Sequence, residues 1–320
     1  MSDQIKVEIV KDSISDDEIR ITTFRLKFHS KILPDLLTHR VFSRTALNSL
    51  VIPVKEMIKQ VREDPMMPSY WSSDKLGMQL SDELTGSDLV KAKAIWKATA
   101  IMAADQAETL QGLHLHKQVI NDLLEPWLPV SIVLTTTELN NFFNLRIHKN
   151  EKPEFKELTS KIKNALAEST PQVLKYKHEE WHLPYVSDEE LADLIETHGS
   201  RVGTKLARIC SAARCARVSY LNHDKTDPTF EDDLELYNML VTRPFNDGKG
   251  NDLGANYPVH LSLLEHQAKP MEMPYGSLDV MENGYWDLEG VTHVDCDFNR
   301  WSGNFRGWVQ NRQLLDDRRD

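Results

Sequence analysis

A long alanine-rich segment, from Ser87 to Gln111, is the strongest predicted helix of the chain. Alanine has the best helix propensity, Ser87 can cap the first turn, and Gly112 can end the last one. Two strand-like segments lie on either side of this helix: residues 19–28 alternate apolar and polar side chains, and residues 130–137 are rich in β-branched residues. Because helices separate the few strands, the sequence predicts an α+β fold in which a mostly antiparallel sheet packs against long helices.

Further helices are predicted where apolar residues recur at helical spacing or a capping residue precedes them. They cover residues 33–43, 53–63, 116–127, 138–148, 154–166, 188–199, 203–220 and 303–315. Residues 65–86 are predicted to form a loop, and residues 171–187 and most of 243–303 to be irregular. We find no internal repeat and no heptad pattern, which excludes solenoid and coiled-coil architectures.

The composition is that of a globular protein without a disulfide framework. Hydrophobic residues make up 40% and charged residues 27%, which excludes a disordered chain. The three cysteines, Cys210, Cys215 and Cys296, predict reduced thiols and a cytoplasmic protein, and no run approaches the roughly 18 apolar residues that span a bilayer. A net charge of −11 argues against binding to polymeric nucleic acid, so local arginines must hold any anionic ligand.

The segment from His178 to His182 matches the H-E-x-x-H pattern of zinc proteases. That chemistry needs both histidines on one face of a helix, with the glutamate as general base. Pro184 follows closely, the preceding residues are strand-like, and no third ligand stands at an obvious spacing. We therefore predict a loop with solvated charges and no metal site. We also interpret His114 and His116 as capping or core residues rather than metal ligands.

Two arginine-containing segments each have two possible explanations. The first is a basic run that consists of Arg201, Lys205, Arg208, Arg214 and Arg217. This basic run can present guanidinium groups to a phosphate, or it can form a solvated stripe on a helix. Arg306, in the segment GNFRGW, can bind a ligand or pack at the surface. The sequence has no Walker A motif and no G-x-G-x-x-G, so neither the P-loop nor the Rossmann route to phosphate binding is available.

Three other segments place polar side chains among apolar ones. They are THRVFSR at residues 38–44, TELNNFFNLR at residues 137–146, and HLSLLEHQA at residues 260–268. Polar groups inside apolar helices need hydrogen-bond partners, and a bound ligand is one candidate. Together these segments form the candidate functional site.

The three segments resemble the flavin-dependent thymidylate synthases, a family unrelated to the synthases that use a cysteine nucleophile. That family carries R-H-R-x-x-S, then N-x-x-x-x-R on a helix, and an A-R-x-S-Y block that leads to H-x-S-P-F-E-H. The matching residues here are THRVFS, NNFFNLR, ARVSY and HLSLLEH, with the strand TTFRLKF before the first of them. The segments LLEPW, WHLP and SGNFRGW resemble a longer branch of the family found in phages and bacteria.

The order of these blocks differs from that of the compact family members, where the S-Y and S-P-F-E-H blocks come first. The resemblance therefore implies a circularly permuted thymidylate synthase-like fold, as a single domain over residues 1–320. Its first half, residues 1–170, contains THRVFS and NNFFNLR, and its second half, residues 200–320, contains ARVSY and HLSLLEH. Residues from both ends of the chain are then expected to meet in one site.

The resemblance also implies a role for individual residues. FAD contacts are expected from His39, Arg40, Asn141, His260, Ser262 and Glu265. Arg146 is expected to bind the pyrimidine of dUMP and to polarise it for attack, which makes it the catalytic residue. Further substrate contacts are expected from Arg44, Asn48, Ser49 and Arg306. Glu265 is expected to be a hydrogen-bonding anchor beside the flavin rather than a proton donor.

The chain departs from the family where dUMP binds. Thr38 replaces the first arginine of R-H-R, and the family's N-E-x-S-x-R positions are occupied here by Thr45, Ala46, Asn48 and Leu50. Leu50 cannot make an ionic contact, and one lost charge-assisted bond to phosphate costs about 1.5–3 kcal/mol. Either another arginine replaces it, or the nucleotide has changed, or activity has been lost; the candidates for replacement are Arg44, Arg306 and Arg312.

The activity that the resemblance implies is reductive methylation of dUMP to dTMP. Methylenetetrahydrofolate is the implied one-carbon donor, and NADPH the implied reductant of FAD. The implied assembly is a homotetramer with sites at subunit interfaces. Three alternatives stay open: another pyrimidine nucleotide such as dCMP, a hydroxymethylated product, and an inactive nucleotide-binding homologue.

Overall fold

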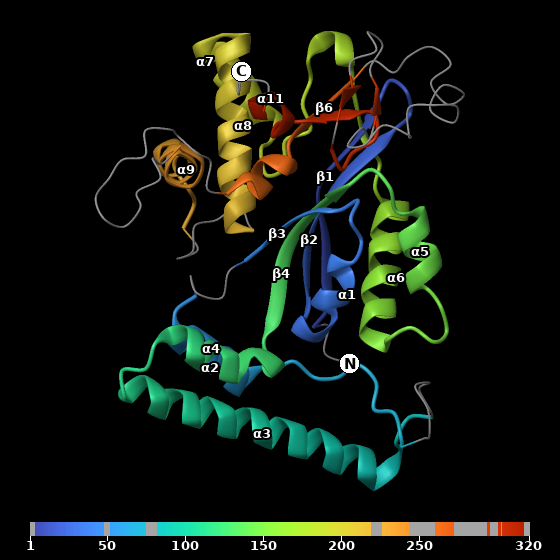
Figure 1. Ribbon diagram of the computed structural model, residues 1–320, viewed down its shortest axis with the longest axis vertical. Coiled ribbons are helices and arrows are strands. Elements are labelled where there is room, and N and C mark those ends of the chain that lie inside the picture. Colours follow the sequence, from blue (N-terminus) through green and yellow to red (C-terminus); the bar gives the residue numbers. More distant parts are fainter. Residues whose placement is uncertain are drawn as a thin grey trace.

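The computed structural model describes residues 4–47, 52–74, 82–218, 226–242, 260–271, 293–294, 300–301 and 303–316 (Figure 1). Its centre is a five-stranded sheet in the order β3-β4-β2-β1-β5. The strands are β1 (Lys6–Ser15), β2 (Arg20–His29), β3 (Ser43–Ala46), β4 (Pro129–Thr136) and β5 (Gln172–Leu174). All neighbours pair antiparallel except β1 and β5. The predicted α+β class and the mostly antiparallel sheet are confirmed, while the circular permutation stays a prediction.

The described helices form three groups around this sheet (Figure 1). Beside the sheet lie α5 (Asn140–Arg146) and α6 (Pro153–Glu168), with the short α1 (Leu33–Leu37) near one end. Below it lie α2 (Val54–Glu63), α3 (Gly86–Gly112) and α4 (Lys117–Leu124). Above it lie α7 (Asp188–His198), α8 (Ser200–Arg217), α9 (Phe230–Tyr237) and α11 (Gln313–Asp316), with the strands β6 (Ala268–Pro270) and β9 (Trp308–Gln310). None of the helices in the described ranges has the length and apolar character of a membrane span.

Shorter elements complete the described structure. A π-helical turn, Asn238–Thr242, follows α9 directly, and the two-residue strands β7 (His293–Val294) and β8 (Arg300–Trp301) pair with each other. Single 3₁₀ turns cover Ser30–Ile32, Glu125–Trp127, Tyr176–His178 and Leu261–Glu265. The last of these turns contains most of the HLSLLEH block, so that block is not a regular helix.

One face of the sheet carries the main apolar core. Alternation along β2 sends Phe24, Leu26 and Phe28 to this face, where all three are fully buried. They pack with residues of β4 and with Phe142 of α5 and Phe155 of α6. The pattern that predicted a strand at residues 19–28 is therefore the pattern that fixes α5 and α6 against the sheet.

The opposite face carries a continuous row of polar side chains, all buried except the half-buried Thr45 at its end. In order across β1, β2, β4 and β3, the members of this polar row are Ser13, His182, Thr23, Thr135, His266 and Thr45. Successive members lie 2.7–2.9 Å apart. A neutral imidazole offers one donor and one acceptor, so the whole row is satisfied with both histidines uncharged. Burial lowers the pKa of His266 to about 3 and that of His182 well below its usual value.

The polar row predicts that the protein loses stability in mild acid. An unfolded histidine binds a proton near pH 6.5, whereas His182 and His266 stay neutral when folded. The free energy of unfolding is therefore highest above about pH 6.5. It falls as the pH drops towards the folded pKa, by up to about 1.4 kcal/mol per pH unit for each histidine. Urea unfolding between pH 7.5 and 5 measures this slope. A His266→Gln variant with an unchanged slope would contradict the assignment.

Two predicted helices are wrong in part. The helix expected at residues 33–43 ends at Leu37, and β3 begins at Ser43, because that segment completes the sheet by pairing with β4. The helix expected at residues 303–315 is instead the strand β9 followed by the short α11, because residues 308–310 pair with β6. The strand β1 was not predicted, since charged residues interrupt its apolar pattern, and β5 lies in a segment expected to be irregular.

The contact between α7 and α8 depends on a glycine without a side chain. A Cβ atom on Gly203 would lie 2.5 Å from the backbone oxygen of Leu194. Glycine to alanine in a helix normally stabilises by roughly 0.5–1 kcal/mol, but here the helices would have to separate. We expect Gly203→Ala to destabilise the protein by about 1–3 kcal/mol in thermal unfolding. Gly112→Ala, where nothing lies within 4 Å, is the control and should cause no loss.

Candidate functional site

The candidate site is organised by β3, an edge strand of the sheet. Side chains alternate along a strand, so Ser43 and Thr45 face the polar row while Arg44 faces the apolar core and α1. Two of the three sequence segments singled out above meet at this strand from opposite faces. The segment 137–146 ends beside α1 on one face, and the segment 260–268 packs on the other.

The first group of polar residues, the arginine–histidine group, comprises Thr38, His39, Arg146 and Glu151. Nε of Arg146 donates to Nε2 of His39 at 3.0 Å, and Nη1 donates to the Glu151 carboxylate at 2.8 Å. Nη2 lies 3.4 Å from the Thr38 hydroxyl. The guanidinium carbon also stands 4.6 Å from the ring centroid of Phe155. The Arg146 guanidinium is therefore held in one orientation from several sides.

His39 is neutral in this arrangement. Its ring is buried among Phe42, Phe142 and Phe155. Burial lowers the pKa of His39, and the positive charge of Arg146 lowers it further. A neutral imidazole can accept a hydrogen bond at Nε2, as the contact with Arg146 requires. The histidine therefore acts as a fixed acceptor that orients the arginine.

Arg146 keeps donor capacity for a ligand. A guanidinium has five N–H groups, and the contacts with His39, Glu151 and Thr38 use three of them. The Arg146 side chain is 20% exposed, so its remaining N–H groups are within reach of a bound molecule. Glu151 offsets part of the positive charge, since it forms an ion pair with the same guanidinium. The arrangement can donate hydrogen bonds to a carbonyl or anionic oxygen.

The second group, the edge-strand group, surrounds Ser43 on the other face of β3. Its members are Ser43, Glu265, Asn304, Gln310 and Arg312. The amides of Asn304 and Gln310 each donate to the Ser43 hydroxyl at 3.0 Å. Glu265 forms an ion pair with Arg312 and accepts from Asn304 at 3.4 Å. Residues near position 43 and residues near position 310 are thus in direct contact, as expected if both ends of the chain build one site.

The three arginines considered as replacements for the family arginine at position 50 differ in their hydrogen-bond partners. Arg44 donates to the backbone oxygens of Leu37 and His39, at 2.9 and 3.2 Å. Arg312 is paired with Glu265. Arg306 is held by its backbone N–H, which donates to the Thr137 hydroxyl at 3.1 Å, and its buried side-chain Nε has no partner among the described residues. Arg306 is therefore the one of these three with an unsatisfied buried donor.

The other predicted site residues lie outside these two groups. Arg40, Asn141 and His260 are exposed, and Ser262 is half-buried. Asn48 and Ser49 lie outside the described residues, as does Leu50. Sequence reasoning missed three members of the groups, Glu151, Asn304 and Gln310. Asn304 lies within the GNFRGW segment, where only Arg306 was singled out, and Gln310 lies just after that segment. Glu151 could have been indicated only by its nearness to Arg146, because single acids and amides carry no motif.

The H-E-x-x-H segment forms no helix. Glu179 has a left-handed φ of 52°, His178 is exposed and lies 3.7 Å from Glu180, and His182 is fully buried in the polar row. The predicted loop is confirmed. Within the described ranges, no group of three or more potential ligand side chains is placed to hold a metal. His116 caps α4 by accepting from the Gln118 N–H at 3.3 Å, which confirms its interpretation as a capping residue.

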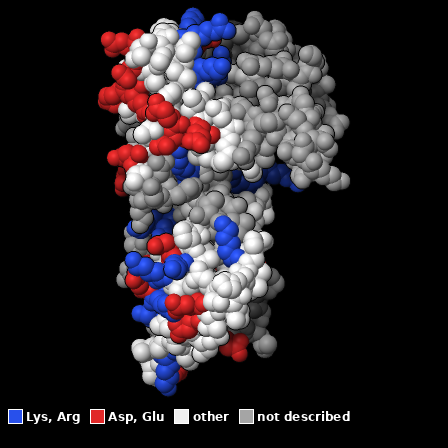
Figure 2. Space-filling model, turned by 90° about the vertical axis from the view of Figure 1, so that its left-hand side faces the viewer, with Lys and Arg blue, Asp and Glu red and all other residues white. Residues whose placement is uncertain are grey.

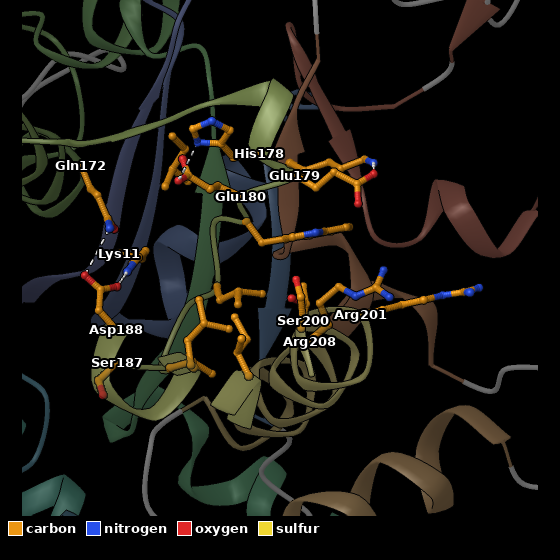
Figure 3. A pocket seen from close by; sticks show the side chains of 18 of the residues that line it. Lys11, Gln172, His178, Glu179, Glu180, Ser187, Asp188, Ser200, Arg201 and Arg208 are labelled. Atoms are coloured by element: carbon orange, nitrogen blue, oxygen red, sulfur yellow. Dashed lines mark hydrogen bonds and ion pairs between the residues drawn. The ribbon is translucent and has the colours of Figure 1, made fainter. Parts of the chain in front are cut away.

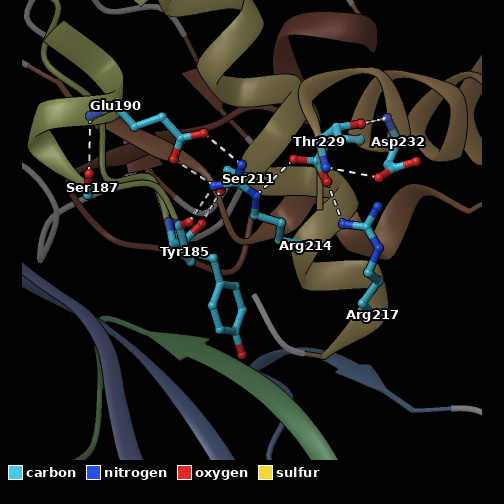
Figure 4. A network of polar contacts seen from close by, with 10 residues as sticks. Tyr185, Ser187, Glu190, Ser211, Arg214, Arg217, Thr229 and Asp232 are labelled. Atoms are coloured by element: carbon cyan, nitrogen blue, oxygen red, sulfur yellow. Dashed lines mark hydrogen bonds and ion pairs between the residues drawn. The ribbon is translucent and has the colours of Figure 1, made fainter. Parts of the chain in front are cut away.

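The basic run separates into two parts, because its members point to different sides of α8. Arg214 and Arg217 are buried and both bind Asp233 of α9, so neither interpretation of the run applies to them (Figure 4). Arg214 also binds Glu190 of α7 at 2.6 Å. Burial alone would lower the pKa of Arg214, but the carboxylates of Glu190 and Asp233 raise this pKa above its usual value. This ion network joins α7, α8 and α9.

Comparison with known proteins yields structural similarity only. No family model and no curated protein matches the chain. Among solved structures, the chain is similar to PolB, a UMP/dUMP methylase from Streptomyces cacaoi, bound with 5-Br UMP. The two chains are 14% identical and superpose with a TM-score of 0.40, and the match covers 51% of this chain and 88% of PolB. PolB bound with 5-Br dUMP gives 14% identity and a TM-score of 0.37, with 51% and 90% covered. Similarity at this level does not by itself assign a family or a reaction.

Proposed function

We propose that the protein is a flavin-dependent methyltransferase that converts dUMP to dTMP. The observation that carries this proposal is the hydrogen bond between His39 and Arg146, which lie 107 positions apart in the sequence. The two residues come from two blocks that resemble the flavin-dependent thymidylate synthases. Glu265, from a third block, reaches Ser43 of the first block through Asn304. Three separate segments that resemble motifs of one family thus lie in or beside β3, which supports the proposal.

The role proposed for Arg146 is electrostatic. Its free N–H groups donate to a pyrimidine carbonyl oxygen and stabilise the negative charge that develops there during attack. His39 and Glu151 hold the guanidinium in place before the substrate arrives, which avoids reorganisation during the reaction. No protein nucleophile is needed. Cys210 and Cys215 are buried, and burial raises the pKa of both thiols, which makes them poor nucleophiles.

The phosphate of the nucleotide is proposed to bind Arg306. Its buried Nε lacks an acceptor among the described residues, and a buried donor without a partner costs about 1–3 kcal/mol. A phosphate oxygen would satisfy it. Arg306 thereby takes the place of the family arginine that Leu50 replaces in the sequence.

The donor set fits a flavin dinucleotide in chemical type. Arg40, Asn141 and His260 are exposed and suit phosphate and hydroxyl groups, while Ser262 and Glu265 can accept from ribose or ring N–H groups. When bound, FAD reduced by NADPH supplies a hydride, and methylenetetrahydrofolate supplies the one-carbon unit and leaves as tetrahydrofolate.

A changed nucleotide or product is the second candidate, favoured by one observation. Ala46, which stands where the family has glutamate, is exposed at the end of β3, so this position offers no carboxylate to a substrate. Another pyrimidine nucleotide, such as dCMP, or a hydroxymethylated product is compatible with that loss. An inactive nucleotide-binding homologue would bind flavin without turnover of any pyrimidine nucleotide.

The decisive experiment is anaerobic turnover with FAD, NADPH, methylenetetrahydrofolate and either dUMP or dCMP, with products identified by mass spectrometry. A dTMP mass together with tetrahydrofolate supports the proposed reaction. A product from dCMP alone, or a hydroxymethylated mass, supports the second candidate. A flavin-loaded protein without any product overturns both in favour of the inactive homologue.

The homotetramer is also proposed, and α3 offers a surface for it. Val90, Ile95 and Met102 of this helix are exposed by 68, 67 and 62%. Large apolar side chains exposed close together are candidates for burial at a subunit interface. Light scattering should give about four times the chain mass of 36.8 kDa. Ile95→Asp should reduce that mass, whereas Lys97→Asp should not; a monomer at all concentrations contradicts the assembly.

A further inference from the structure

A cavity of about 680 Å³ lies between α7, α8 and the edge of the sheet that carries β5 (Figure 3). Cavities of roughly 300–1,000 Å³ are typical of small-molecule sites. No member of the arginine–histidine group or of the edge-strand group lines it. The cavity is thus separate from the candidate site described above, and the proposed reaction does not use it.

The inner wall of the cavity is apolar. Leu183, Val186 and Trp181 contribute buried side chains, and Leu191 packs against the same cluster. Ile195, one turn further along α7, also lines the cavity. An apolar wall of this kind favours a ligand with a hydrophobic body, because binding removes apolar surface from water.

Cations are concentrated on the α8 side of the cavity. Arg201, Thr204 and Arg208 lie three and four positions apart, so they share one face of α8, and all three line the cavity. Arg208 is held with its guanidinium carbon 4.5 Å from the ring centroid of Trp181 and donates to Asn311 at 3.2 Å. Figure 3 shows Arg201 and Arg208 on one side of the cavity, opposite Lys11, Gln172 and Asp188.

Two of the three acidic side chains that line the cavity have cationic partners: Asp188 binds Lys11 at 2.9 Å, and Glu179 binds Lys269 at 3.4 Å. The third, Glu180, accepts from the backbone N–H of Lys175 at 2.7 Å. Arg201, by contrast, forms no ion pair within the part of the chain that the structure describes. With four cationic and three acidic side chains, the lining of the cavity carries a net positive charge.

This local positive charge contrasts with the rest of the protein. The chain has a net charge of −11, and Figure 2 shows acidic side chains gathered on the upper part of one face. The overall field repels anions, so an anion would bind only where cations are placed at close range. The α8 side of the cavity is such a place.

We propose that this cavity binds a small amphipathic organic anion. Its carboxylate, sulfonate or phosphate group contacts Arg201 beside Arg208, and its hydrophobic body lies against Leu183, Leu191 and Ile195. The proposal explains why two members of the basic run, Arg201 and Arg208, stay at the surface of a cavity while Arg214 and Arg217 are buried in ion pairs.

Two matched fluorescent probes test the ligand class on the full chain. The first, 8-anilinonaphthalene-1-sulfonate, carries an aromatic body and one negative charge; the second, N-phenyl-1-naphthylamine, is the same body without the sulfonate. We expect one saturable site for the sulfonate, with at least tenfold higher affinity than for the neutral probe. Equal affinity overturns the anionic part of the proposal. If inorganic phosphate displaces the sulfonate probe as effectively as phenyl phosphate does, the proposal that the ligand has a hydrophobic body is overturned.

Variants locate the site. Arg201→Glu, at an exposed position, should weaken binding of the sulfonate probe at least tenfold, whereas Lys149→Glu, at an exposed position outside the cavity and outside α8, should leave it within about twofold. Thr204→Trp should abolish binding by filling the cavity. Equal losses in both glutamate variants, or no loss in Arg201→Glu, overturn the proposal. Arg146→Ala should retain full probe binding; loss there would place the probe in the candidate nucleotide site instead.

Discussion

Replacing Arg146 with alanine is expected to abolish nucleotide turnover while leaving flavin absorbance largely intact. The variant removes the donor proposed to stabilise charge on the pyrimidine, and losing one such donor typically costs a factor of about 10²–10³ in kcat. It also leaves His39 and Glu151 without their shared partner, but both stand at the edge of the apolar core and not within the sheet. Steady-state kinetics and the absorbance spectrum of the purified variant measure the two effects separately.

Lys149→Ala is the matched control, since Lys149 is an exposed cation three positions after Arg146. It should change kcat by less than twofold. Arg146→Lys keeps the charge but cannot contact His39, Glu151 and Thr38 together, so we expect it to recover only a small part of the activity. Activity of Arg146→Ala within a few-fold of the native protein would show that the role proposed for Arg146 is wrong.

Replacing Asp233 with alanine is expected to cause the largest loss of stability. Asp233 is fully buried and pairs with Arg214 and Arg217, whose side chains are 3 and 4% exposed. Without it, Arg217 loses its carboxylate partner while it stays buried. Removing one partner from a buried ion pair costs about 3–5 kcal/mol, because an uncompensated charge remains. Chemical unfolding followed by circular dichroism measures this change.

Glu231→Gln tests whether the loss belongs to the buried network. Glu231 lies two positions before Asp233 in the first turn of α9 and is exposed. Its removal should cost less than about 1 kcal/mol, as is usual for surface charges near a helix N-terminus. Equal destabilisation by both variants would indicate that α9 responds to any loss of negative charge and not to the broken network.

Local patterns in the sequence predicted most of the larger elements. Alternation at residues 19–28, β-branched residues at 130–137 and the alanine-rich segment after Ser87 match β2, β4 and α3 within about one residue. Alternation, β-branched content and alanine content are properties of the local sequence, so they are visible without knowledge of the fold. The loop at the H-E-x-x-H segment was also predicted, because Pro184 and the strand-like residues before it are local signals, whereas the burial of His182 was not predicted.

Elements that depend on distant partners were not predicted. Ser43 was predicted to end a helix, but residues 43–46 form β3 because they pair with the edge of β4; β9 likewise forms by pairing with β6. The candidate site shows the same limit. His39 and Arg146 were identified through motifs, whereas Glu151, Asn304 and Gln310 owe their places to tertiary contacts that no short sequence pattern encodes.

The edge-strand group has a consequence for folding kinetics. The Ser43–Gln310 contact joins residues 267 positions apart, and the Thr45–His266 contact joins residues 221 apart. Closing such long loops has a high entropic cost before any contact forms, so these contacts are expected to form after the folding transition state. Weakening them, for example by Gln310→Ala, should accelerate unfolding and leave the refolding rate nearly unchanged. The lifetime of the assembled site is then set by how often the segment around Gln310 detaches from β3.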